Sequence, residues 1–228
     1  MFVKDPVFGN IALTELEAKI IDTEEMQRLR HIKQTGFAYL VYPGAMHSRF
    51  EHSLGTMYIS KEVAKGIGLE DEEAELLALA GLLHDIGHGP FSHTSDNLLK
   101  KYLNTNHEEI GKKIIKEGRI GEIIEKYGFS KEEVIEKLSG KSKGELVTAS
   151  LGSDRLDYLL RDAHYTGAAY GVIDYQQIKS KITIYKNKLA IYEQGIAPAE
   201  SLLLARYFMF TTVYYHHAVS IASQMFEK

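Results

Sequence analysis

The chain has 228 residues, of which 44% are hydrophobic and 25% are charged, and its formal net charge is −4. This length accommodates one large domain or two small ones, and the apolar fraction is enough for a sizeable core. The absence of cysteine excludes disulfides, thiolate metal sites and a cysteine nucleophile, and the acidic balance indicates no nucleic-acid partner, although it leaves a local basic patch open.

The first third of the chain is predicted to hold a short extended segment and several helices. Turn signals predict an extended arm or hairpin over residues 2–12. Capping-box patterns at Thr14–Glu17 and Asp22–Glu25 predict the starts of two short helices. Beyond a break at Tyr42–Gly44, a further helix is predicted from Ser48 to about Lys65.

The middle of the chain is organised around an apolar helix that ends in polar residues. The run from Ala74 to Leu83, with Asp71 as its predicted cap, delivers the adjacent pair His84-Asp85. Two glycines and a proline within residues 87–90 then break the helix. Because the helix is predicted to be core, its polar end is predicted to face a cavity rather than bulk water.

The second half of the chain is predicted to be helical apart from one hairpin. The segments expected in order are helices at about 94–102 and 107–116, small surface helices within 118–144 such as Lys131–Leu138, a helix at 150–164, a glycine- and tyrosine-rich loop at 165–175, a hairpin of strands 182–185 and 189–192, and a helical run from Pro198 to Phe226. With no linker between two cores, one mostly helical domain over residues 1–228 is predicted.

Since the last residues lie inside an expected helix, the chain is expected to be a fragment or shorter than its relatives.

Targeting signals are absent from the sequence. No apolar run approaches the roughly 18 residues that span a bilayer, and the N-terminus lacks a signal-peptide pattern. A cytoplasmic protein without a membrane partner is expected.

The break after the central helix concentrates side chains that bind metals. His84, Asp85, His88 and His93 lie within ten positions, and Asp96 follows. Imidazole and carboxylate are the ligands that suit Zn, Fe, Ni and Mn. The competing interpretation is a helix cap with scattered histidines, but buried His and Asp side chains must find partners.

Several motifs resemble those of the HD-domain phosphohydrolases. The matching stretches are Ile21–Gly36, Tyr42–Gly55 including Arg49-Phe-Glu-His52, Leu83–His93, and Ser153–Asp162. They are most similar to the branch that holds the SAM-and-HD-domain deoxynucleoside triphosphate triphosphohydrolase and its microbial relatives. The resemblance covers nearly the whole chain in order, and it implies the all-helical HD fold (all-α) with one small hairpin near 182–192.

The resemblance assigns a metal centre to four residues. The family's ligands fall on His52, His84, Asp85 and Asp154. Two imidazoles and two carboxylates neutralise a divalent cation and leave positions open for water. One divalent transition metal is implied (Fe, Mn, Ni, Co or Zn), with Mg as a further ion carried by the substrate phosphates.

The resemblance also implies catalytic and substrate-binding residues. A catalytic histidine and its supporting carboxylate fall on His93 and Asp96, and a second pair falls on His107 and Glu108. The implied substrate contacts are Gln34, Arg49, His88, Arg155, Tyr158, Asp162, Arg206, Tyr214 and His216. In the SAM-and-HD-domain member of the family, the position of Arg155 carries lysine, so arginine keeps the charge and alters the geometry. For the Tyr207–Tyr215 aromatics, the competing interpretation is plain core.

These implications predict a metal-dependent hydrolase of deoxynucleoside triphosphates that releases the deoxynucleoside and tripolyphosphate. A second interpretation keeps the site and changes the substrate to a nucleoside monophosphate, a pyrophosphate or a cyclic nucleotide. A third is a nucleotide- or nucleic-acid-binding module with a structural metal. The relatives' behaviour implies a homo-oligomer with a nucleotide as the binding partner.

Overall fold

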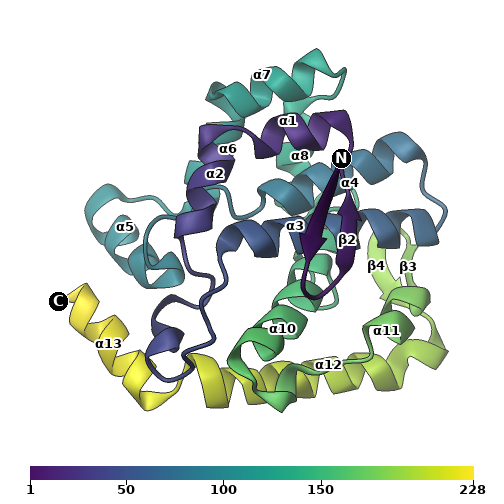
Figure 1. Cartoon of the computed structure of the whole chain (residues 1–228). Helices are drawn as coiled ribbons and strands as arrows, with labels where there is room; N and C mark the ends of the chain where they lie inside the picture. The colour runs from purple at the N-terminus through teal and green to yellow at the C-terminus, as the bar shows by residue number, and fades with distance from the viewer.

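The computed structural model covers residues 1–228 and is mostly helical (Figure 1). Helices α3 (Arg49–Gly66) and α4 (Asp71–Leu83) are consecutive, pack along each other and occupy the middle of the molecule, with α10 (Ser153–Thr166) packed against α3. The all-helical prediction is confirmed. None of the helices combines the length and apolarity needed to cross a bilayer.

The other helices surround this pair. In chain order they are α1 (Glu15–Ile21), α2 (Glu24–Gln27), α5 (Asp96–Leu103), α6 (His107–Glu117), α7 (Arg119–Lys126), α8 (Lys131–Leu138), α9 (Glu145–Thr148), α11 (Tyr175–Lys181), α12 (Ile196–Met209) and α13 (His217–Glu227). Short 3-10 turns lie at Arg28–His31, Gly36–Leu40, Ser92–Ser95, Ala169–Gly171 and Glu193–Gly195.

Two separate antiparallel hairpins complete the fold. At the N-terminus, β1 (Phe2–Asp5) pairs with β2 (Gly9–Ala12), which settles the choice between arm and hairpin. Farther on, β3 (Ile182–Tyr185) pairs with β4 (Lys188–Ile191), as predicted. Its turn has two residues, Lys186 and Asn187, both with positive φ, so the second strand begins one residue earlier than expected.

Two predicted caps are wrong. Asp22 ends α1 with helical backbone angles, and the extended residue that caps α2 is Thr23, whose hydroxyl accepts from the Met26 N–H. Asp71 is the first residue of α4 rather than its cap, because the extended conformation falls on Glu70. An N-cap must leave the helical region of backbone angles, and in both cases the neighbouring residue does so.

Two helical boundaries also differ from the prediction. Helix α11 follows the loop at 165–175 and was not predicted; the Asp174 carboxylate caps it by accepting from the Gln177 N–H. The expected continuous helix to Phe226 is interrupted by a π-helical turn at Phe210–Tyr214 before α13 begins. The β-branched run of residues 211–213 weakens helix propensity there, and the Thr211 hydroxyl bonds to backbone carbonyls of the preceding turn.

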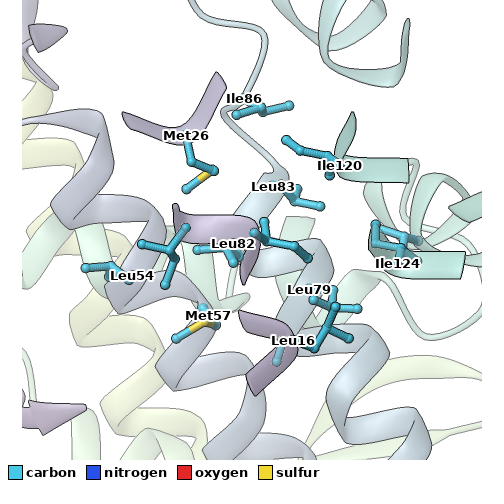
Figure 2. Close-up of a cluster of buried hydrophobic side chains, with 14 of the residues drawn as sticks. Leu16, Met26, Leu54, Met57, Leu79, Leu82, Leu83, Ile86, Ile120 and Ile124 are labelled. Atoms are coloured by element: carbon cyan, nitrogen blue, oxygen red, sulfur yellow. The ribbon is translucent and has the colours of Figure 1, made fainter. Parts of the chain in front are cut away.

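The hydrophobic core consists of two clusters that share the central helices. In the first, shown in part in Figure 2, Leu54 of α3 and Leu79 of α4 pack with Leu16, Met26 and Ile124 from α1, α2 and α7. In the second, other side chains of α3 and α4 pack with α10 and α12; these include Ile59, Leu77, Leu159 and Leu202. From Leu76 to Leu83 helix α4 is therefore buried on both faces, which explains why this stretch of its sequence is apolar all round.

The close contact between α3 and α10 requires glycine at position 55. A Cβ built there would lie 1.7 Å from the Asp157 Oδ1 and 2.4 Å from the Arg161 Nη2. We expect Gly55→Ala to lower the free energy of unfolding by about 2 kcal/mol, because the buried carboxylate or the helix must shift. Urea unfolding monitored by circular dichroism measures the change.

Gly66, in the last turn of the same helix, is the matched control. Its Cβ would meet nothing within 4 Å, so Gly66→Ala is expected to be neutral or stabilising by about 0.5–1 kcal/mol. Equal stabilities of the two alanine variants would contradict the role assigned to Gly55.

Candidate metal centre

The turn after α4 is held in place by contacts from two other segments. The Arg28 guanidinium donates to the backbone carbonyls of Ile86 and His88, which satisfies acceptors just beyond the helix end. At Gly87 an added Cβ would lie 1.9 Å from the His107 carbonyl oxygen. Glycine at this position therefore lets the start of α6 approach the turn.

Three helices deliver the four predicted ligands to one point. His52 comes from α3, His84 and Asp85 from the end of α4, and Asp154 from the first turn of α10. The His52 Nε2 lies 3.0 Å from the His84 Nε2, 3.2 Å from an Asp154 oxygen and 3.6 Å from an Asp85 oxygen. Donor atoms about 2.1 Å from one ion would be separated by roughly 3.0–3.5 Å. The ligand atoms of His52, His84 and Asp85 all lie within 4.8 Å of one another, and an Asp154 oxygen lies within 3.7 Å of both imidazoles, so the spacing fits a metal ligand sphere.

The tautomers of the two histidines support this fit. The His84 Nδ1 lies 2.8 Å from the Gly81 carbonyl oxygen and the His52 Nδ1 lies 2.6 Å from an Asp157 oxygen. Since a carbonyl and a carboxylate only accept, both Nδ1 atoms carry hydrogen, and in the neutral rings both Nε2 atoms are lone-pair donors. Two lone pairs facing each other at 3.0 Å repel unless a cation lies between them.

The ionisation states of the side chains at this centre also favour the binding of positive charge. Burial on its own would lower the pKa of His52, but hydrogen bonds to Asp154 and Asp157 outweigh it and raise that pKa to about 10. Burial would likewise raise the pKa of Asp85, and the positive charge of Arg49 lowers it well below its usual range. The carboxylates are therefore ionised, and either a proton or a metal ion balances them.

Arg49 faces this centre from the first turn of α3. Its Nη1 donates to Asp85, and its Nε donates to the Ser92 hydroxyl at 3.0 Å. The side chain is almost fully buried. Arg49 thus orients a predicted ligand and adds positive charge at the wall of the cavity.

A second group of histidines lies beside the first. The Asp96 carboxylate accepts from the Nδ1 atoms of His93 (3.1 Å) and His107 (2.8 Å). Burial would raise the pKa of Asp96, and these hydrogen bonds lower it overall. His88 stacks on His107 with ring centroids 3.8 Å apart, and burial together with Arg49 lowers the pKa of His88 to about 3.

Both groups border one cavity of about 680 Å³. Thirteen of the predicted site residues line it: Gln34, Arg49, His84, Asp85, His93, His107, Glu108, Asp154, Arg155, Tyr158, Asp162, Arg206 and Tyr214. His52, His88 and Asp96 lie behind this lining. His216 is not brought to the cavity; its imidazole caps α13 by accepting from the Ala218 N–H at 3.3 Å.

The predicted substrate residues differ in how they are held. Arg155 is paired with Asp154 and donates to the Thr148 carbonyl. The Asp162 carboxylate lies 2.7 Å from the His47 Nε2 and also accepts from the Tyr214 hydroxyl. Burial raises the pKa of Tyr214 well above its usual value, so its hydroxyl remains a donor.

Several residues of the site were missed by sequence reasoning. Asp157 orients His52, and Arg161 is fully buried against Asp157. Asp157 lies three positions after Asp154, a helical spacing that places both on one face and was available as a signal. Lys112 lines the cavity from α6 and pairs with no carboxylate; nothing in its sequence context distinguishes it from the other lysines.

Comparison with known proteins places these features in a family. Residues 49–161 match the HD domain family, and residues 173–228 match the HD associated region. An uncharacterized protein of Methanocaldococcus jannaschii is 44% identical over 99% of this chain and 48% of its own length. The deoxynucleoside triphosphate triphosphohydrolase SAMHD1 of Gallus gallus is 37% identical, over 72% of this chain and 33% of its own length.

Solved structures agree with the sequence matches. A hypothetical protein from Aquifex aeolicus superposes with a TM-score of 0.89 at 40% identity, over 98% of this chain and 62% of that one. A phosphohydrolase from Bacteroides thetaiotaomicron gives 0.87 at 35% identity, over 99% and 57%. The chain spans about half of the length of the first two curated relatives it matches, 48% and 54%. The chain belongs to the HD-domain phosphohydrolase superfamily, on the branch that includes the deoxynucleoside triphosphate triphosphohydrolases.

Proposed function

We propose that the protein is a metal-dependent phosphohydrolase that splits deoxynucleoside triphosphates into the deoxynucleoside and tripolyphosphate. The proposal is based on the side chains that line a single cavity. Three of the four proposed metal ligands line it, His84, Asp85 and Asp154, and the fourth, His52, lies directly behind His84. The cavity wall also presents Lys112 and Arg206, which form no ion pair. Unpaired cations beside a metal centre favour a polyanionic substrate.

In this proposal, different residues of the chain bind the metal ion and the phosphate groups. A divalent ion held by His52, His84, Asp85 and Asp154 would polarise a phosphoryl oxygen and offset the developing charge. Lys112 and Arg206 would neutralise the remaining phosphate oxygens. Arg49 would keep the Asp85 carboxylate in its orientation through their ion pair.

Proton transfer falls to His93. Its Nδ1 is engaged by Asp96, so its Nε2 is the nitrogen left for the substrate. The side chain is 68% exposed, which lets a ligand in the cavity reach it. When water attacks the α-phosphorus, the bond to the 5′ oxygen of the sugar breaks, and His93 would donate its proton to that oxygen.

Sugar recognition is assigned to Asp162 and Gln34, which also line the cavity. The Asp162 carboxylate is fixed by His47 and Tyr214. The buried Gln34 Oε1 has no hydrogen-bond partner within the chain, so it is available to accept from a hydroxyl group. We assign the 3′-hydroxyl of the deoxyribose to these two side chains.

A substrate panel with product analysis tests the proposal. Purified protein is incubated anaerobically with each deoxynucleoside triphosphate and Mn²⁺ or Mg²⁺, and the products are separated by anion-exchange chromatography. Deoxynucleoside and tripolyphosphate in equal amounts are expected. Release of orthophosphate or pyrophosphate would instead assign one of the other phosphoester activities. Nucleotide binding at full metal occupancy without turnover of any substrate would indicate a binding module.

A further inference from the structure

A line of buried charged side chains runs from the N-terminal hairpin to the metal centre. The Arg161 Nη1 donates to the Asp5 Oδ2 at 2.8 Å, and its Nη2 and Nε donate to the two Asp157 oxygens at 2.8 and 3.0 Å. The Asp157 Oδ2 in turn accepts from the His52 Nδ1 at 2.6 Å. None of these four residues is more than 3% exposed.

The two oxygens of the Asp5 carboxylate bind two different parts of the fold, the hairpin turn and Arg161. Its Oδ1 accepts from the backbone N–H groups of Val7 and Phe8, both at 2.9 Å, and so closes the turn between β1 and β2. Its Oδ2 binds Arg161. The Phe8 ring packs on Tyr58 with ring centroids 5.3 Å apart, which fixes the turn against α3.

The charges of Arg161 and Asp157 explain the role of Asp5 in this line of buried side chains. Arg161 and Asp157 alone would form a neutral pair, in which the guanidinium N–H now bound by Asp5 would be a buried donor without a partner. Asp5 satisfies that donor and adds a negative charge, so the set as a whole is anionic. An anionic partner on the Nδ1 side of a histidine raises the basicity of the Nε2 that faces the metal.

We propose that Asp5 is a positioning residue for the metal centre. Through Arg161 and Asp157 it fixes the orientation and basicity of His52, so the seating of residues 2–12 sets the affinity of the centre for a divalent cation. The hairpin is thus a functional part of the site although none of its residues lines the cavity. This inference rests on the metal centre of the proposed function.

The test is the affinity of Asp5→Asn for Zn²⁺ and Mn²⁺, measured by competition with a chromophoric chelator. The amide oxygen still accepts from the turn, but the amide NH₂ cannot accept from Arg161. Loss of an outer-shell partner weakens metal affinity by roughly 10–100-fold, and a loss of about tenfold is expected here.

A double-mutant cycle separates positioning from a general loss of stability. If Asp5 acts through Asp157, then Asp5→Asn lowers affinity in the native background and has little further effect in Asp157→Asn. Ile124→Val, a buried truncation in α7, is the control: it lowers the melting temperature without changing metal affinity. Phe8→Leu loosens the turn and leaves Asp5 in place, so a smaller loss of affinity is expected; it replaces Asp5→Asn if that variant does not fold.

The inference is overturned if the folded Asp5→Asn protein binds metal within twofold of the native chain. It is also overturned if the losses from Asp5→Asn and Asp157→Asn simply add. Either result leaves the proposed function intact. Failure of the native chain to bind a divalent metal would instead remove the proposed function.

Discussion

Asp154→Ala is expected to abolish both metal binding and hydrolysis. The substitution removes one of the two proposed carboxylate ligands, so two imidazoles and Asp85 would no longer neutralise a divalent cation. Since outer-shell losses alone cost 10–100-fold, affinity should fall by more than about 100-fold. Metal content after dialysis against a metal-buffered solution and product formation from the preferred deoxynucleoside triphosphate are the two measurements.

Asp71→Ala is the matched control for this variant. Asp71 is an exposed residue at the start of α4, and its side chain makes no capping hydrogen bond. The control should retain metal and activity. An Asp154→Ala protein that holds a full equivalent of metal would exclude Asp154 from the ligand set.

His93→Ala is expected to keep the metal and lose turnover by about 10²–10⁴-fold, the usual contribution of a general acid. The His93 imidazole hydrogen-bonds to Asp96 and belongs to the second histidine group. Removing it therefore leaves the four donor atoms in place. Metal content and kcat, measured on the same preparation, separate this variant from Asp154→Ala.

The choice of leaving group tests the role of His93 directly. Nitrophenolate departs without a proton, so the loss caused by His93→Ala should be much smaller for a nitrophenyl phosphodiester than for a deoxynucleoside triphosphate. His31→Ala, at an exposed position outside the cavity lining, serves as the control. Equal losses on both substrates would show that His93 does not protonate the leaving oxygen.

The sequence predicted most of the helices, though not α11, and the polar end of α4, because these depend on local patterns. The apolar run to Leu83, the capping box at Thr14 and the helix start at Ser48 reappear in the structure. The proximity of His52 and Asp154 to His84 depends on tertiary packing, which the spacing of hydrophobic residues along the chain does not reveal. It was predicted through family resemblance. Their roles as ligands remain predictions that the metal analysis tests.

The contacts that no local pattern predicted are long-range and polar. Asp5 reads as a turn residue in the sequence, and only the packed structure brings it to Arg161. In the sequence, Lys112 cannot be distinguished from a surface lysine. Its place in the cavity wall becomes evident only from the packing of α6 beside the cavity. The interruption after Met209 had a local cause in the β-branched residues 211–213, which the apolar character of the run obscured.

The sharing of α3 and α4 by both hydrophobic clusters has a thermodynamic consequence. Neither cluster can lose its packing without exposing a face of a helix that the other cluster also needs. We therefore expect the two halves of the core to melt in one cooperative transition rather than in sequence. Because the proposed ligands sit on these same helices, a bound ion would stabilise the native state globally, and the melting temperature would rise with free metal concentration.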